Sequence, residues 1–356
     1  MSSTQSGPLA ASDIEEPPPG PHSPPRQGYQ PVETSVEYVD GMISVDSTDN
    51  DSAIANLSRA ASVFSVQSSV YDYMVENGRT YHRFKEGNYV MPNDEIEQDR
   101  LDMQHYVWSI ALQDQLFPAP IKPNPQNVLD MGTGTGIWAI DFAFRFPSAQ
   151  VIGNDLSPIQ PNFIPANCTF EIDDIEDHWT YSQKFDFIHG RLLISCFKDH
   201  RAVLKRAFDA LAPGGYLEMQ DADFPMKCVD DSLNGTALWK WNMLIEEGAK
   251  KVGKPWTRTN QYKGWMEEIG FVDIEEKILP WPINTWPKDT YLKLLGLWFQ
   301  FDLLEGLNST TALLTRGLGW STEEVESLLV DVRKDIENRR VHAYVQMHVV
   351  YGKKPG

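Results

Sequence analysis

Cysteine is scarce in this chain. The three cysteines, Cys168, Cys196 and Cys228, lie far apart and form no Cys-x-x-Cys pair. This spacing excludes a cysteine-rich zinc site and a disulfide framework, and it is typical of a reducing intracellular compartment. We therefore expect neither a metal site nor a disulfide in this protein.

Secretory and membrane-spanning segments are also missing from the sequence. Residues 1–10 contain no basic stretch followed by an apolar run, so we expect no signal peptide. No stretch approaches the ~20 apolar residues that a spanning helix needs. We therefore expect a soluble protein without a membrane partner, located in the cytoplasm, the nucleus or both.

Positive charge is the third shortage. The chain has 31 Lys and Arg residues against 50 Asp and Glu residues, which gives a net charge of −19. A protein with this charge is repelled by phosphate backbones and anionic membrane surfaces. Because no local basic patch offsets the repulsion, we expect no direct nucleic-acid partner.

Large apolar side chains are sparse in residues 1–70, which are acidic and rich in Pro and Ser. The ordering of a segment removes conformational entropy that only extensive apolar burial can offset. This composition cannot supply that burial. We predict that residues 1–70 form a disordered tail.

Glycine, in contrast, is concentrated in residues 127–140. The segment begins as an apolar strand, passes through Gly132, Gly134 and Gly136, and ends as the start of an apolar helix. Glycines remove the Cβ atoms from such a turn, so a ligand can approach the backbone and the amides of the helix N-terminus. This pattern predicts a nucleoside-cofactor site, with a chance glycine-rich turn as the alternative.

The spacing of these glycines distinguishes among cofactors. A dinucleotide-binding G-x-G-x-x-G loop would have its third glycine at position 137, which is Ile137 here. A P-loop is excluded because no Gly-Lys-Ser/Thr follows. Asp130, at the end of the strand, suits a cationic ligand such as an amino acid ammonium better than a diphosphate. The loop therefore favours S-adenosylmethionine.

Two further acids follow predicted strands. Asp155 ends the strand at 150–156 and lies about 20 residues past the glycine loop, where such folds place a carboxylate on the ribose hydroxyls. Asp174 follows the strand at 169–172, where an acid can accept the adenine amino group. A solvated acidic loop is the alternative interpretation of this second position.

Strands and helices alternate at short intervals through the rest of the chain, which predicts a parallel α/β sheet. Further strands are expected at 185–189, 216–221, 271–274 and 341–351. Helices are expected at 94–108, 137–146, 199–211, 261–269 and 291–307 and from 321 onward. The helix at 291–307 is apolar but contains Asp302 and other polar residues, so we expect it to be partly exposed.

Several stretches resemble one protein family. The glycine loop, Asp155, Asp174, Asp186 and the Leu-Ala-Pro-Gly-Gly sequence at 211–215 resemble the motif series of class I S-adenosylmethionine-dependent methyltransferases. The stretches at 89–95, 97–105, 185–191, 318–325 and 349–355 resemble the fungal LaeA-like methyltransferases more narrowly. The resemblance covers about residues 75–355.

The resemblance implies a Rossmann-like seven-stranded sheet, mostly parallel, with helices on both faces and the last strand antiparallel. It divides the chain into the tail at 1–70, a helical cap over the cofactor at 71–126 and a methyltransferase domain at 127–356. We expect the Trp-rich segment at about 224–310 to roof the methyl acceptor, with about two of its tryptophans at the site and the others in the core.

The resemblance also assigns residues to an S-adenosylmethionine site. The glycines would line the methionine end, Asp155 would bind the ribose, and Asp174 with the Ile175 amide would hold adenine. The residues expected to bind the cofactor are Asp130, Gly132, Gly134, Gly136, Asp155, Leu156, Asp174, Ile175 and Arg100. His189 is the candidate catalytic base, with simple packing against the cofactor as the alternative.

Two roles are compatible with this family. The first is an enzyme that methylates a small-molecule acceptor in fungal secondary metabolism. The second is a LaeA-like regulator of secondary metabolism and development that acts through a velvet-type nuclear protein partner. An NAD-dependent oxidoreductase, a third hypothesis, is disfavoured by the early Gly136.

Overall fold

The structure is a computed structural model that describes residues 74–82, 89–256 and 258–356. The tail at 1–70, for which disorder was predicted from composition, lies outside the described residues.

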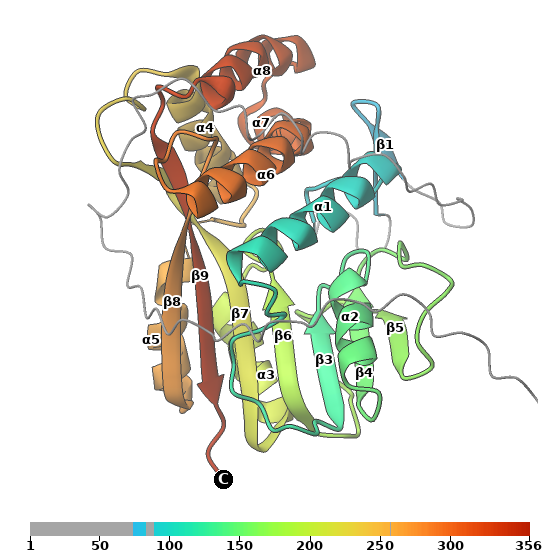
Figure 1. The fold of residues 1–356 in the computed structure, drawn as a ribbon. Coiled ribbons are helices and arrows are strands. Elements are labelled where there is room, and N and C mark those ends of the chain that lie inside the picture. The colour runs from blue at the N-terminus through green and yellow to red at the C-terminus, as the bar shows by residue number, and fades with distance from the viewer. Residues whose placement is uncertain (1–73, 83–88, 257) are drawn as a thin grey trace, which may run out of the picture. The chain divides into compact units, whose positions relative to one another are not determined.

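Seven strands form one mixed sheet in the order β5-β4-β3-β6-β7-β9-β8 (Figure 1). The strands are β3 (Asn127–Met131), β4 (Gln150–Asp155), β5 (Cys168–Ile172), β6 (Phe185–Arg191), β7 (Leu211–Cys228), β8 (Val272–Pro282) and β9 (Ala343–Lys353). Strands β3 to β7 pair in parallel, whereas β9 is antiparallel to both β7 and β8. The predicted fold class is confirmed. The strand order reverses between β3 and β6, which is where ligands bind in such sheets.

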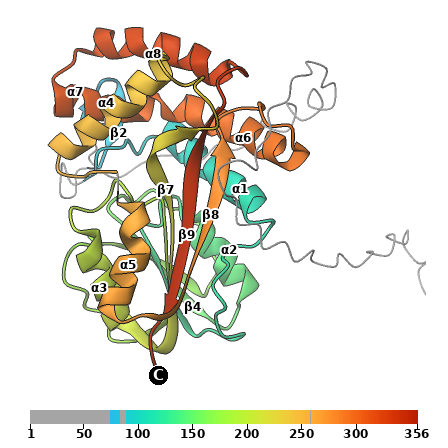
Figure 2. The ribbon, with the colours of Figure 1, turned by 90° about the vertical axis from the view of Figure 1, so that its left-hand side faces the viewer.

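Helices cover both faces of the sheet because its strands are apolar on both faces. The middle strand β3 shows this, since Val128, Leu129 and Met131 are all 0% exposed. Figure 2 shows helices on either side of the sheet. They are α2 (Ile137–Arg145) on one face and α3 (His200–Ala210) and α5 (Tyr262–Ile269) on the other.

A layer of helices, here called the cap, lies above the carboxyl ends of the strands (Figure 1). Its helices are α1 (Glu95–Ala111), α4 (Ala237–Lys251), α6 (Thr290–Gly306), α7 (Thr311–Leu318) and α8 (Thr322–Glu337). The short elements are the hairpin of β1 (Met74–Glu76) and β2 (Arg79–Tyr81) and the 3-10 turns η1 (Thr259–Gln261) and η2 (Asn308–Thr310). The cap therefore combines a segment that precedes the sheet with segments that follow β7.

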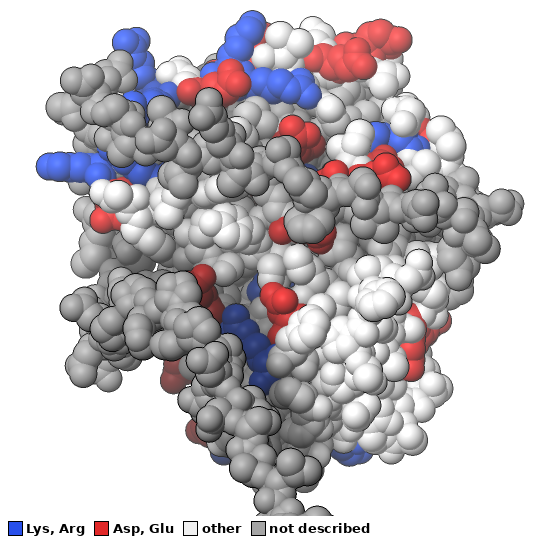
Figure 3. Space-filling model, turned by 45° about the vertical axis from the view of Figure 1, so that its right-hand side comes forward, with Lys and Arg blue, Asp and Glu red and all other residues white. Residues whose placement is uncertain are grey.

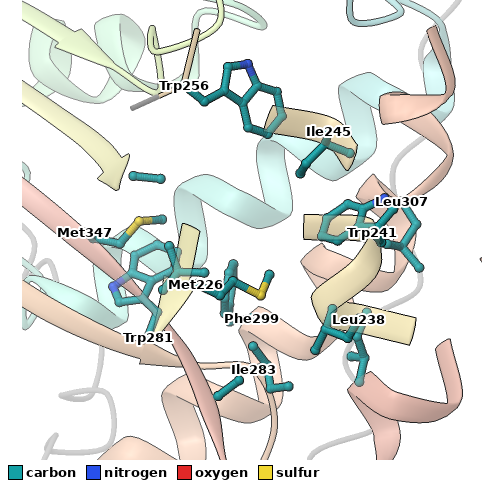
Figure 4. Close-up of a cluster of buried hydrophobic side chains, with 14 of the residues drawn as sticks. Met226, Leu238, Trp241, Ile245, Trp256, Trp281, Ile283, Phe299, Leu307 and Met347 are labelled. Atoms are coloured by element: carbon teal, nitrogen blue, oxygen red, sulfur yellow. The ribbon is translucent and has the colours of Figure 1, made fainter. Parts of the chain in front are cut away.

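The cap has its own apolar core, in which Trp241, Trp281 and Phe299 are at least 95% buried (Figure 4). Helices α4 and α7 approach very closely, because a Cβ added at Gly248 would lie 2.3 Å from the carbonyl oxygen of Leu313. Only glycine allows this approach, so the packing of the cap depends on residue 248.

The cap only partly coincides with the predicted roof at 224–310. Helices α7 and α8 extend it past residue 310. Within the predicted bounds, α5 and the first part of β8 instead belong to the sheet layer, whereas Trp281 near the end of β8 packs in the core of the cap.

Charged side chains of both signs are interspersed over the cap on the face shown in Figure 3. They are sparser below the cap on that face, and no basic patch gathers there among the described residues. Nor is any helix in the described part of the chain long and apolar enough to cross a membrane.

Candidate active site

A cavity of about 270 Å³ lies between the carboxyl ends of the strands and the cap. Its lower wall comes from the loops after β3, β4, β5 and β6, and its upper wall from α1, α4 and α6. Segments that precede β3 and segments that follow β7 therefore enclose the same cavity. The cavity has a polar half near the glycine loop and an apolar half inside the cap.

The glycine loop forms the floor of the polar half. Gly132, Gly134 and Gly136 have φ angles of +58°, +58° and +81°, a region that other residues rarely adopt. Gly136 is the N-cap of α2 and supplies no side-chain hydrogen bond, so the first turn of that helix is left uncapped. A loop of this kind fits a ligand that lies directly on the backbone.

Asp155, at the end of β4, fixes the glycine loop to the neighbouring strand. Its carboxylate accepts hydrogen bonds from the backbone N–H groups of Gly134 and Ser157, both at 2.9 Å. Burial raises the pKa of this carboxyl to about 6, against the lowering effect of these two N–H donors. Leu156 follows it on the cavity wall.

The loop after β5 forms the next part of the wall. Asp174 is buried, and its Oδ1 accepts a hydrogen bond from the Glu176 N–H at 2.9 Å. Asp174 and Ile175 both line the cavity beside the end of β4. Every residue predicted at the cofactor site therefore lies on this cavity or, in the case of Gly136, in the loop that forms its floor.

Asp130 and His189 form a buried pair at the ends of β3 and β6. His189 Nδ1 lies 2.7 Å from Asp130 Oδ1, and the Thr133 hydroxyl donates to Asp130 Oδ2 at 2.5 Å. Burial lowers the pKa of His189 to about 4, although Asp130 opposes the shift. The imidazole is therefore neutral at pH 7, and its Nδ1–H donates to Asp130.

The surroundings of His189 favour a positioning role over a catalytic one. The ring is 0% exposed and stacks on Trp138 with centroids 3.8 Å apart and planes at 3°. This arrangement orients the Asp130 carboxylate toward the cavity. The role of His189 as a base stays a prediction from sequence.

Arg100 lies on the upper wall, where two carboxylates surround it. It donates to Glu97 Oε1 at 2.7 Å within α1 and to Asp302 Oδ1 at 2.7 Å on α6. Burial lowers the pKa of Arg100, but the charges of Glu97 and Asp302 outweigh burial and raise it above its ordinary value. The Ser309 hydroxyl donates to the other oxygen of Glu97 at 2.5 Å. This network joins the two cap segments.

Asp302 is the polar residue of α6 whose burial the sequence does not predict. The helix at 291–307 is partly exposed, as predicted, because Phe301 is 45% exposed, but Asp302 itself is only 3% exposed. An acid in an apolar run signals a buried ion pair as readily as a solvent-facing position. Its partner Arg100 lies 202 residues away in the sequence, so the pattern near Asp302 could not identify it.

The apolar half of the cavity is lined mainly by side chains of the cap and of the strands that rise into it. Two of the seven tryptophans in the predicted roof, Trp241 and Trp256, lie on its wall. The main apolar side chains around them are Ile194, Phe224, Phe299, Leu303, Val345 and Met347. The wall is suited to a flat, largely apolar molecule.

Comparisons with known proteins agree with this architecture. Residues 103–276 match a family model described as a methyltransferase domain. The methyltransferase pytC of Aspergillus terreus is 37% identical over 303 residues, which cover 84% of this chain and 94% of that protein. The secondary metabolism regulator laeA of Monascus pilosus is 36% identical and covers 79% of this chain and 77% of its own.

A solved structure of Haemonchus contortus phosphoethanolamine N-methyltransferase 2, in complex with phosphomonomethylethanolamine and S-adenosylhomocysteine, has a TM-score of 0.44. It is 17% identical and covers 72% of this chain and 58% of its own. The sheet order and the glycine loop define the class I methyltransferase architecture. With relatives above 30% identity across most of both chains, this protein belongs to the LaeA-like family of S-adenosylmethionine-dependent methyltransferases. It is an enzyme, and its cofactor is S-adenosylmethionine.

Proposed function

We propose that this methyltransferase acts on a small, largely apolar molecule of fungal secondary metabolism, in the cytoplasm, the nucleus or both. The observation that carries the proposal is the apolar half of the cavity, which continues from the glycine loop into the cap. Such a wall binds an aromatic or aliphatic scaffold through apolar contact, with few polar groups to orient it.

The cofactor would lie across the polar half of the cavity. Asp155 would accept the ribose hydroxyls, Asp174 and the Ile175 amide would hold adenine, and Leu156 would pack on the ring system between them. The glycine loop would lie against the methionine group, with Asp130 near its ammonium. Arg100 would contribute indirectly, because its two ion pairs hold α1 over the cofactor.

When bound, S-adenosylmethionine supplies a methyl group already activated on a sulfonium. The protein's part is to hold an acceptor atom in line with that methyl, and such positioning supplies ~7–11 kcal/mol of the barrier. An amine or thiolate acceptor needs no base. A hydroxyl acceptor gains roughly 10²–10⁴-fold from one. His189 stays the sequence-based candidate for that base, whereas its burial and its stacking on Trp138 favour a positioning role.

Metabolite profiling tests this function. Profiles of a deletion strain and of a strain carrying Gly134→Val are compared with the wild-type strain. We expect both to lose one methylated product and to accumulate its unmethylated precursor. Unchanged profiles in both strains would contradict the proposal.

The second candidate is a regulator of secondary metabolism acting through a velvet-type partner. It is favoured by a relative named as a secondary metabolism regulator, at 36% identity. The profiling experiment separates the two functions, because a regulator silences many unrelated products at once. Retention of those products in the Gly134→Val strain, but not in the deletion strain, would indicate regulation without methyl transfer.

A further inference from the structure

Arg191 is a cation in the cavity wall without a carboxylate partner. It ends β6, donates from Nε to Gln220 Oε1 at 2.7 Å and from Nη1 to His105 Nδ1 at 3.1 Å, and lies over the Trp108 ring at 5.2 Å. None of these partners carries a negative charge. Within the described part of the chain, no carboxylate oxygen lies within 4.0 Å of its guanidinium.

The other arginine on the cavity is in the opposite state. Arg100 makes hydrogen-bonded ion pairs with both Glu97 and Asp302, so its charge is already neutralised by the protein. A ligand carboxylate at Arg100 would have to compete with two buried anions. At Arg191 a ligand carboxylate would meet a positive charge that the protein leaves unpaired.

The charge of Arg191 persists at neutral pH. Burial lowers its pKa to about 10, and the more distant Asp130 and Glu218 only partly offset this. Arg191 is half-buried, and a charge that is partly removed from water without an opposite charge beside it is unfavourable, so a bound anion would stabilise it. The hydrogen bond to His105 holds the guanidinium in place, since His105 Nε2 in turn donates to Asp141 Oδ2 at 3.1 Å.

Arg191 also has an opposite charge nearby at the same sheet edge. Asp130 on β3 is paired in register with His189 on β6, and Arg191 is the second residue after His189. The carboxylate and the guanidinium thus end neighbouring parallel strands beside the glycine loop, but they are more than 4.0 Å apart. A ligand group that carries an ammonium and a carboxylate on one carbon could pair its ammonium with Asp130 and its carboxylate with Arg191.

We propose that Arg191 binds the carboxylate of the methionine group of S-adenosylmethionine, while Asp130 binds its ammonium. The assignment rests on the proposed placement of the cofactor across the polar half of the cavity. It makes Arg191, and not Arg100, the residue that recognises the amino acid end of the cofactor. Charge-assisted hydrogen bonds from a guanidinium suit a carboxylate in geometry and strength.

The test is calorimetric titration at pH 7.5 of the full chain with S-adenosylmethionine and with its decarboxylated analogue, which keeps the ammonium and sulfonium. We expect Arg191→Gln to raise the Kd for S-adenosylmethionine about 10–100-fold, the range for the loss of a hydrogen bond to a charged group. The analogue should bind wild type and variant equally. Arg191→Lys should recover part of the affinity, and Arg145→Gln, on the surface of α2, should change neither ligand.

If Arg191→Gln weakened the binding of both ligands equally, Arg191 would only support the fold. If the variant kept its affinity for S-adenosylmethionine, the anion that Arg191 binds would belong to another molecule, such as the acceptor. Either result overturns the proposal. Wild-type protein that binds the analogue as tightly as S-adenosylmethionine would overturn it as well. Failure of the cofactor placement itself would appear separately, as affinity unaffected by Asp155→Ala.

Discussion

The two halves of the cavity are built in different ways. The polar half comes from residues 130–191, at the ends of the four adjacent strands β3, β4, β5 and β6 and in the loops that follow them, and it presents backbone amides and carboxylates. The apolar half comes from α4, α6, β7 and β9, together with α1. In the proposed placement, the first half would bind a cofactor common to a whole class of enzymes. The second can change with the acceptor, because its wall is side chains on cap helices.

The largest expected effect of a single substitution lies in the polar half. Gly134→Val places a β-branched residue at φ +58° and directs its methyl groups into the gap below Leu101 of α1. The backbone strain alone is about 1–3 kcal/mol. We expect the Kd for S-adenosylmethionine, measured by calorimetry, to rise more than about 100-fold.

Gly214→Val is the matched control for this substitution. Gly214 has φ +81° and no atom within 4 Å of an added Cβ, and it lies at the amino end of β7, away from the cavity. It should lose similar stability and keep its affinity for S-adenosylmethionine. Equal loss of affinity in both variants would show that global destabilisation, and not the loop, explains the result.

A second substitution tests the packing of the cap. Gly248→Ala brings a Cβ to 2.3 Å from the Leu313 carbonyl oxygen, so α4 and α7 must separate. We expect a loss of about 1–3 kcal/mol in the free energy of unfolding, measured by chemical denaturation. S-adenosylmethionine affinity should change less than in Gly134→Val, because the substitution strains the contact between Gly248 and Leu313 in the cap and not the glycine loop.

The control for the cap substitution is Gly264→Ala in α5. No atom lies within 4 Å of a Cβ added there, so the variant should gain about 0.5–1 kcal/mol from helix propensity. A Gly248→Ala protein as stable as this control would contradict the close helix contact.

The same division explains what could be predicted from the sequence. The strands, the glycine loop, Asp155 and Asp174 follow from local patterns, since each depends on a strand and the few residues after it. Among the described residues, the seven-stranded, mostly parallel sheet and the antiparallel β9 also agree with the family resemblance. The cofactor roles of individual residues stay predictions until ligand binding is measured.

The structure of the cap was harder to predict from the sequence. Helix α4 was not predicted, although Thr236 caps it and Lys250 and Lys251 occupy its last turn, both ordinary signals of helix ends. The pairing of Arg100 with Asp302, and the lack of a carboxylate at Arg191, depend on side chains brought together from distant segments. A local sequence pattern does not show which charged side chains form an ion pair in the folded protein.

The pH dependence of S-adenosylmethionine binding tests the role of Asp155 in the polar half. The carboxyl of Asp155 has its pKa raised to about 6 by burial, and only the ionised form can accept both ribose hydroxyls. S-adenosylmethionine affinity should be constant above about pH 7 and fall roughly tenfold by pH 5. Asp155→Asn should bind more weakly and show a flatter profile by calorimetry.

The stability of the free protein should follow pH in the opposite direction. A carboxyl whose folded pKa lies above its unfolded value of 3.8 binds protons preferentially in the folded state. Its contribution to stability is greatest below pH 4 and is lost as pH rises through about 6. If S-adenosylmethionine affinity instead fell with rising pH, as the stability contribution of Asp155 does, the ionised carboxylate would not be the form that binds the ligand.

The smallest expected effects come from two tryptophans of the apolar half. Trp256 Nε1 is buried and has no hydrogen-bond partner within the described residues, whereas Trp241 Nε1 donates to Thr310 Oγ1 at 3.3 Å. Both indoles line the cavity, so their replacement by Phe removes similar apolar area and leaves the glycine loop untouched. Trp241→Phe also loses a hydrogen bond, and chemical denaturation should show it to be less stable than Trp256→Phe by about 0.5–1.5 kcal/mol. Neither variant should change S-adenosylmethionine affinity, and both should alter the amount of methylated product formed in the strain. A change in cofactor affinity in either variant would show that the two halves are coupled, and the acceptor half could then not vary independently of the cofactor half.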